Sequence, residues 1–102
     1  MHYVICYDLE SDRLREKVAK LLQRHGCNRV QKSVFVAADM SNKHLSMLQR
    51  ALTSAMEKGT SAPQDSVLLI PLPDACAQAT RAIGGLNSIL ATTAVLPLKI
   101  IV

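Results

Sequence analysis

The stretch Tyr3-Val4-Ile5-Cys6-Tyr7-Asp8, near the start of the chain, decides the fold. It is rich in β-branched and aromatic residues and is apolar at both odd and even positions, which predicts a buried strand. Ser11 or Asp12 then supplies a helix N-cap, and residues 13–25 repeat apolar side chains with helical spacing. Gly26 follows as a typical helix stop, so the chain opens with a strand, a turn and a helix.

Three further elements follow from the same patterns. Residues 28–38 predict one or two strands, and residues 66–72 predict a strand that is apolar on both faces. Between them, residues 42–58 predict a second amphipathic helix, capped by Ser41 and ended by Gly59. The elements therefore come in the order β-α-β(β)-α-β.

This order is that of the ferredoxin-like α+β fold, in which two helices cover one face of an antiparallel sheet. A chain of 102 residues is the usual size of one domain. We therefore predict a single ferredoxin-like domain over residues 1–102, with its core at 1–72 and a variable tail with a final strand at 73–102.

The tail has weaker patterns than the core. Residues 74–83 predict a short helix that Gly84 and Gly85 interrupt, and residues 98–102 predict an additional C-terminal strand. Residues 86–97 carry no pattern that assigns them to an element.

The strands at 3–8 and 66–72 are apolar on both faces, although two helices can cover only one face of the sheet. A bare second face would expose several hundred Å² of apolar surface, more than monomers usually tolerate. We therefore expect a two-fold homodimer that packs sheet against sheet, with residues 98–102 suited to cover a sheet edge.

Composition excludes several classes of protein. The chain is 49% hydrophobic and 20% charged, which excludes a disordered protein, and no apolar run reaches the roughly 18 to 20 residues that would span a bilayer. Its beginning lacks the pattern of a secretion signal. Cys6, Cys27 and Cys76 fit neither a disulfide framework nor a zinc site. We expect a cytoplasmic protein with no membrane partner.

The net charge is +4, and seven of the twelve Lys and Arg residues lie between positions 13 and 32. At about 100° per residue, four of them form one stripe beside the apolar face of the first helix: Arg13, Lys17, Lys20 and Arg24. Such a stripe is typical of a surface that binds nucleic acid, and a solvated helix face is the alternative. Because no aromatic side chains alternate with the stripe, we expect contacts to phosphates with little sequence specificity.

Asp8 is the first candidate for chemistry because it ends an apolar strand at a turn, where binding residues project from a rigid element. A turn residue that caps nearby backbone is the alternative. In a two-fold dimer, two copies of Asp8 near the axis would suffice for Mg²⁺, which usually takes one or two carboxylates. His25 continues the apolar stripe of the first helix and suggests a structural role, whereas His2 and His44 suggest surface residues.

Two motifs together resemble a known family. Tyr7-Asp8 precedes Asp12, Arg13 and a basic helix, and the later segment reads Arg29-Val30-Gln31-Lys32-Ser33-Val34-Phe35. This combination resembles the small CRISPR-associated adaptation proteins, the second member of that series, often called CRISPR-associated endoribonucleases. Asp65-Ser66-Val67 before the last core strand is also similar, so the resemblance covers about the first 72 residues.

The resemblance implies a ferredoxin-like homodimer that holds a divalent metal, Mg²⁺ with Mn²⁺ as the alternative, between the two copies of Asp8. It implies that Tyr7, Arg15, Arg29, Ser33 and Phe35 occupy positions involved in nuclease activity or nucleic-acid contact. Lys17 stands where relatives often carry a basic residue.

Two functions follow from the resemblance, and they make different demands on the chain. One is a metal-dependent endonuclease that cuts RNA or duplex DNA in CRISPR adaptation, that is, spacer acquisition; this role requires Asp8. The alternative is a non-catalytic DNA-binding scaffold that bridges two dimers of the CRISPR integrase, which requires the dimer and the basic surface. A small-molecule regulatory domain is a third hypothesis, because the same topology recurs in such modules.

Overall fold

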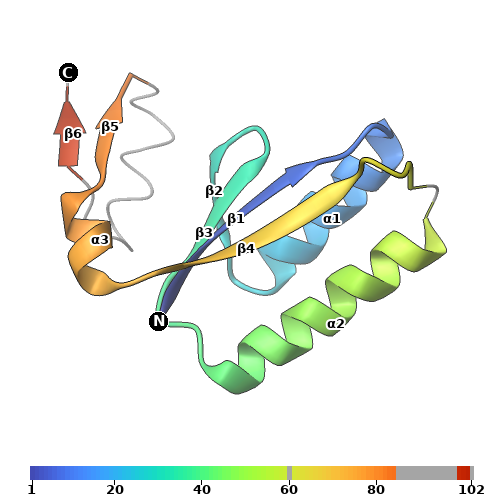
Figure 1. Ribbon diagram of the computed structural model, residues 1–102, viewed down its shortest axis with the longest axis horizontal. Coiled ribbons are helices and arrows are strands. Elements are labelled where there is room, and N and C mark those ends of the chain that lie inside the picture. Colours follow the sequence, from blue (N-terminus) through green and yellow to red (C-terminus); the bar gives the residue numbers. More distant parts are fainter. Residues whose placement is uncertain (60, 85–98, 102) are drawn as a thin grey trace.

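The computed structural model describes residues 1–59, 61–84 and 99–101 (Figure 1). In order, its elements are β1 (His2–Asp8), α1 (Asp12–Arg24), β2 (Asn28–Gln31), β3 (Val34–Ala37), α2 (Asn42–Lys58), β4 (Ser66–Leu72), α3 (Asp74–Ala79), β5 (Arg81–Ile83) and β6 (Lys99–Ile101). All elements predicted up to residue 72 are present. None of the helices in the described part of the chain is long and apolar enough to cross a bilayer.

Three antiparallel strand pairings join four strands into one sheet with the order β2-β3-β1-β4. β1 lies inside the sheet and pairs with β3 on one side and with β4 on the other. Both helices lie on the same side of this sheet (Figure 1). The arrangement confirms the predicted ferredoxin-like α+β fold.

Local capping sets the ends of the two long helices. The side chain of Ser11 accepts a hydrogen bond from the Leu14 N–H at 3.3 Å, and that of Ser41 accepts one from the His44 N–H at 3.1 Å. Gly26 ends the first helical segment with φ +82°, a left-handed conformation that favours glycine. The sequence signals at these three positions therefore act as predicted.

The core lies between the sheet and the two long helices. Alternation along β1 sends Tyr3, Ile5 and Tyr7 into this layer, where they are buried. The largest side chains that are fully buried come from both helices and two strands: Phe35, Ile5, Leu22, Leu48 and Val18. Each contributes roughly 1.5–3 kcal/mol through burial, so this layer supplies the main stabilisation of the fold.

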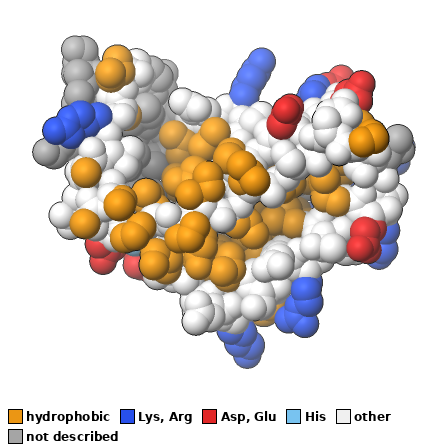
Figure 2. All heavy atoms as spheres, viewed as in Figure 1, with side chains coloured by type: hydrophobic (Ala, Val, Ile, Leu, Met, Phe, Trp, Pro, Cys, Tyr) orange, Lys and Arg blue, Asp and Glu red, His pale blue; other side chains and the backbone are white. Residues whose placement is uncertain are grey.

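The other face of the sheet is covered in part by the same chain. Ala77 of α3 is fully buried against Val36, and Val4 and Leu72 pack around them. The expectation that this face is bare in one chain was therefore wrong near β3, because α3 folds back onto it. Leu68 and Ile70 of β4 remain 54% and 43% exposed, and Figure 2 shows apolar side chains gathered over β4.

The tail differs from the prediction in one element. The expected helix over residues 74–83 ends at Ala79, because Thr80 adopts an extended backbone with ψ 132° and its side chain donates to the Cys76 carbonyl. β5 follows and pairs in parallel with β6, which confirms the additional C-terminal strand. The unassigned stretch 86–97 lies outside the described residues.

His2 is a second correction, because it is buried rather than on the surface. Its Nε2 lies 2.6 Å from Oδ1 of Asp74, and its Nδ1 accepts a hydrogen bond from the Asp39 N–H at 3.0 Å. The side chain thus joins the start of β1 to the start of α3. This contact could not be predicted from the local sequence.

Candidate functional site

A groove of about 700 Å³ lies between α1 and the turn that joins β2 to β3. Four of its lining side chains are cationic, whereas Glu16 is the one carboxylate among them. The polar residues that line it are Tyr7, Arg15, Glu16, Lys20, Gln23, Arg29, Lys32 and Ser33. The structure therefore brings together four of the residues that the resemblance singled out, from three separate parts of the chain.

Tyr7 anchors the β2–β3 turn at the floor of this groove. Its hydroxyl donates to the Lys32 carbonyl at 3.2 Å, and its backbone N–H donates to the Ser33 carbonyl at 3.1 Å. Arg29 Nη2 donates to the same hydroxyl at 3.4 Å. Because the phenol already uses its proton in the turn, Tyr7 acts here by holding the turn that presents Lys32 and Ser33.

Phe35 supports the groove from below. Its side chain is fully buried, so its ring does not reach the surface of the groove. The Arg29 guanidinium carbon lies 5.0 Å from the centre of this ring, within the range of a cation–π interaction. The ring of Tyr7 packs beside it at a centroid distance of 6.2 Å. Phe35 therefore orients the two residues that face the groove.

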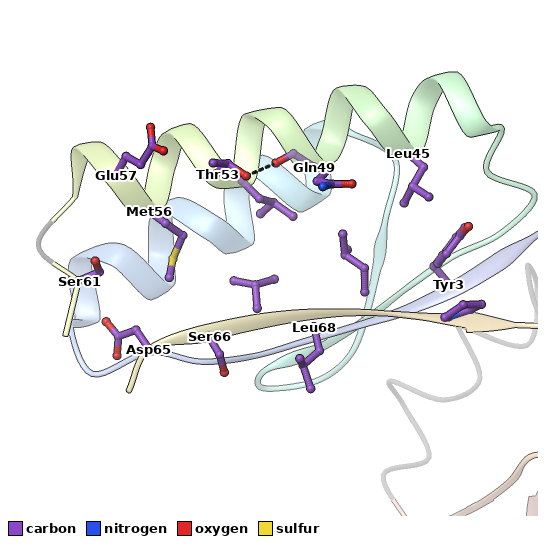
Figure 3. Close-up of a pocket in the computed structure, with 14 residues that line it drawn as sticks. Tyr3, Leu45, Gln49, Thr53, Met56, Glu57, Ser61, Asp65, Ser66 and Leu68 are labelled. Carbon is purple, nitrogen blue, oxygen red and sulfur yellow. Dashed lines mark hydrogen bonds between the residues drawn. The ribbon is translucent and has the colours of Figure 1, made fainter. Parts of the chain in front are cut away.

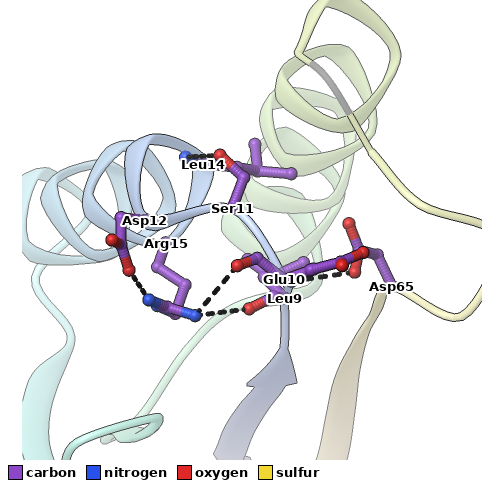
Figure 4. Close-up of polar contacts among 7 residues, drawn as sticks. All are labelled: Leu9, Glu10, Ser11, Asp12, Leu14, Arg15 and Asp65. Atoms are coloured by element: carbon purple, nitrogen blue, oxygen red, sulfur yellow. Dashed lines mark hydrogen bonds and ion pairs between the residues drawn. The ribbon is translucent and has the colours of Figure 1, made fainter.

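Arg15 stands where the groove meets the β1–α1 turn (Figure 4). Its Nη1 donates to the Leu9 carbonyl at 2.8 Å and to the Glu10 carbonyl at 3.2 Å, and its Nη2 forms an ion pair with Asp12. The guanidinium is half-exposed and has five N–H donors, so donors remain for a phosphate.

Asp8 does not line the groove. Because side chains alternate along β1, Asp8 lies on the opposite face of the sheet from Tyr7, paired in register with Ser66. Its carboxylate is exposed, and no hydrogen bond or ion pair within the described part of the chain engages it. No group of three or more His, Cys, Asp or Glu side chains that could hold a metal ion lies together among the described residues.

The predicted basic stripe is exposed along the outer face of α1. Lys20 forms an ion pair with Glu16 at 3.0 Å and also lines the groove, so it joins the stripe to the groove. At the other end, Arg13 and Lys17 border a hollow with Lys58 of α2, which extends the positive surface. The predicted binding residues and the groove therefore form one continuous positive region, which we call the basic surface.

A larger hollow of about 920 Å³ lies between α2 and β4 (Figure 3). Apolar side chains such as Leu45 and Met56 point into it, and Asp65 lies near its end, whereas the Glu57 side chain at its rim points away from the sheet. Its described lining includes carboxylates and no Lys or Arg. This hollow is therefore unsuited to a phosphate backbone, and none of the predicted site residues lies in it.

Four residues that line the groove were not among the predicted site residues: Glu16, Ala19, Gln23 and Lys32. Lys32 lies three positions after Arg29 and belongs to the same cluster of basic residues. That cluster was the sequence feature that could have identified it as a site residue. Asp65, which precedes β4, accepts backbone N–H groups with both carboxylate oxygens, from Glu10 and Ala62.

The cysteines take no part in the groove. Cys27 is buried directly after the end of α1, and this burial raises the pKa of its thiol from 9.0 to about 11. The thiol therefore stays protonated at neutral pH and is a poor nucleophile.

Comparison of the sequence with known proteins shows its family. The sequence profile of the family described as CRISPR associated protein Cas2 matches residues 1–80. The chain is 32% identical over 75 residues to the CRISPR-associated endoribonuclease Cas2 1 of Methanospirillum hungatei, covering 74% of each chain. It is 47% identical over 36 residues to the CRISPR-associated endoribonuclease Cas2 2 of Pyrobaculum aerophilum, covering 35% of this chain and 40% of that protein. The chain therefore belongs to the CRISPR associated protein Cas2 family.

Proposed function

We propose that this protein is a metal-dependent endonuclease of CRISPR adaptation, which binds RNA or duplex DNA through the basic surface of α1 and the adjoining groove. The observation that carries the proposal is the convergence of Arg15, Lys20, Arg29 and Lys32 on one groove. Cationic side chains at such spacing neutralise phosphates and release counterions, which supplies affinity without reading bases. The names of two relatives as endoribonucleases support the same activity.

The carboxylate of Asp8 is a suitable ligand for a divalent cation. Asp8 presents an exposed carboxylate that the described part of the chain leaves free, and Mg²⁺ accepts one or two carboxylates with water or phosphate oxygens in its other positions. When bound, Mg²⁺ or Mn²⁺ would neutralise phosphoryl charge and activate water. The chain's own groups bind and orient the phosphate backbone.

A homodimer is the second part of the proposal, because one chain supplies only one carboxylate at Asp8. The outer edge of β4 has no paired strand in the described part of the chain, and Leu68 and Ile70 are exposed on the same face as Asp8. A two-fold partner packed on this face would cover these side chains and bring two copies of Asp8 toward the axis. The CRISPR integrase is the expected further partner, and we expect both proteins in the cytoplasm.

One observation favours the scaffold function as an alternative. Asp8 lies on the face of the sheet opposite to Tyr7 and the groove, so the basic surface can bind a duplex without placing it at the carboxylate. In that case the dimer would bridge two integrase dimers and would not cut its nucleic acid.

Cleavage and binding by the same preparation distinguish these functions. The wild-type protein and Asp8→Asn are each incubated with labelled RNA and duplex DNA, with Mg²⁺, with Mn²⁺ or with a chelator, and binding is measured by titration in parallel. The nuclease function predicts cleavage that requires the metal and is lost in Asp8→Asn while binding persists. Tight binding without cleavage by the wild type under either metal would instead support the scaffold function.

A further inference from the structure

The two residues that follow Asp8 are held from both sides (Figure 4). Leu9 is almost fully buried in the core, whereas Glu10 is exposed in the turn between β1 and α1. Exposed turns are usually the mobile parts of a domain, and this turn directly adjoins the proposed metal-binding carboxylate. Its hydrogen bonds therefore bear on how well Asp8 is positioned.

Arg15 holds the turn from the side of α1. Its Nη1 donates to both carbonyls of the turn, at 2.8 Å to Leu9 and 3.2 Å to Glu10. Its Nη2 pairs with Asp12 in the first turn of the helix, which keeps the guanidinium in place. One planar cation thus bridges three acceptors, which the single ammonium of a lysine does less well.

Asp65 holds the same turn from the other side, although it lies 55 residues away in the sequence. Its Oδ1 accepts the Glu10 N–H at 3.0 Å, and its Oδ2 accepts the Ala62 N–H at 2.8 Å. Gln64 adds a hydrogen bond from its Nε2 to the Glu10 carboxylate at 3.2 Å. The loop before β4 and the turn after β1 are therefore joined through one carboxylate.

These contacts reach Asp8 through the backbone. Asp65 directly precedes Ser66, and Ser66 is paired in register with Asp8 across β1 and β4. The backbone at Asp8 is therefore fixed by strand pairing up to residue 8 and by the contacts of Arg15 and Asp65 with the two residues that follow it. A carboxylate held in this way loses less conformational freedom when it binds a cation.

We infer that Arg15 and Asp65 are positioning residues, which fix the turn after Asp8 so that this carboxylate is preorganised for the divalent cation. The inference rests on the proposed function, because it assigns a supporting role at the same site. It predicts that changes at Asp65, which lies on another loop, weaken metal binding although Asp65 is not itself a ligand. Supporting residues of metal sites typically change affinity by about 10- to 100-fold.

The test compares Asp65→Ala, the milder Asp65→Asn and Arg15→Lys with the matched control Asp74→Ala. Asp74 also uses a carboxylate to hold a residue of β1, His2, but at the opposite end of the strand. For each full-length protein, Mn²⁺ affinity is measured by calorimetry, amide hydrogen exchange is measured at residues 8–10, and thermal unfolding is recorded. We expect Mn²⁺ affinity to fall about 10-fold or more in Asp65→Ala and Arg15→Lys, less in Asp65→Asn, and less than about 2-fold in Asp74→Ala.

The three measurements separate the inference from the proposed function. Hydrogen exchange at residues 8–10 that is as slow in Asp65→Ala as in the wild type would overturn the inference whatever the metal does. Unchanged Mn²⁺ affinity in folded Asp65 and Arg15 variants would overturn it as well, while Asp8-dependent binding by the wild type would leave the proposed function standing. If the wild type and Asp8→Asn bind Mn²⁺ equally well, the metal-dependent function is overturned. The positioning role assigned to Arg15 and Asp65 is then overturned with it.

Discussion

Tyr7 and Asp8 are neighbours in the chain, yet their side chains lie on opposite faces of the sheet. Tyr7 is buried and holds the turn that borders the basic groove. Asp8 is exposed on the face that carries Leu68 and Ile70. The sheet thus separates the residues proposed to bind phosphates from the residue proposed to bind the cation, so different substitutions should alter binding and cleavage.

Asp8→Asn should abolish metal-dependent cleavage and leave duplex binding within about 2-fold, because the phosphate contacts lie on the other face. The cleavage rates of the wild type and of Asp8→Asn are measured with Mg²⁺, with Mn²⁺ and with a chelator. Full activity in a verified Asp8→Asn protein would contradict the assignment of the metal site.

Removal of positive charge from the outer face of α1 should weaken binding and reduce its dependence on salt. In Arg13→Gln/Lys17→Gln, the slope of log affinity against log salt should decrease by up to about 2, or roughly one counterion per lost phosphate contact. Lys43→Gln/Arg50→Gln removes the same charge from α2 and serves as the control. Equal slopes for the two double variants would show that the duplex does not contact α1 specifically.

The free protein should sediment as a homodimer of about twice 11.1 kDa at micromolar concentration. Leu68→Asp should shift it toward the monomer, because it would place a charge on the apolar face that the partner covers. Met47→Asp is the control, since Met47 is similarly exposed but lies on α2. A wild-type monomer would remove both the interface and the paired metal site.

Substitutions of Phe35 and Arg29 should have different effects on stability and on nucleic-acid binding. Phe35→Leu should lower the free energy of unfolding by about 1–2 kcal/mol, because it shortens a fully buried side chain. Arg29→Gln should change stability by about 1 kcal/mol at most, as it removes one exposed cation–π contact, but should lower nucleic-acid affinity. Denaturant unfolding and duplex titration of both variants check this pair of outcomes. A Phe35→Leu protein as stable as the wild type would contradict the packing role assigned to this ring.

Stability should fall as the pH rises from about 9 to about 11 because of Cys27. Its pKa is raised from 9.0 to about 11 in the folded chain, so the folded state keeps the proton that the unfolded state loses over this range. The stabilisation is complete below pH 9 and is lost as the pH approaches 11. Thermal unfolding of the wild type and of Cys27→Ala measures this loss, and the variant should lack that component of the pH dependence.

Local sequence was sufficient for the elements of the core. Periodicity located both long helices, Ser11 and Ser41 marked where they begin, and Gly26 marked a stop that requires a positive φ. The β-branched, apolar pattern of β1 identified a strand, and the succession of strands and helices along the chain predicted the ferredoxin-like fold. These signals are readable because each depends on residues within about one helical turn or one strand of each other.

The site required the tertiary structure. The motif residues Tyr7, Arg15, Arg29 and Ser33 were identified as a group, but only the pairing of β1 with β3 shows that they surround one groove while Asp8 faces away. Asp65 reaches Glu10 across 55 positions, and His2 is buried because α3 folds back to place Asp74 beside it. The sequence alone thus determined the helices and strands of the core up to residue 72 and their order along the chain. The tertiary structure decided which distant side chains meet, because such contacts depend on how the packed sheet and helices bring separate segments together, and no local pattern encodes that distance.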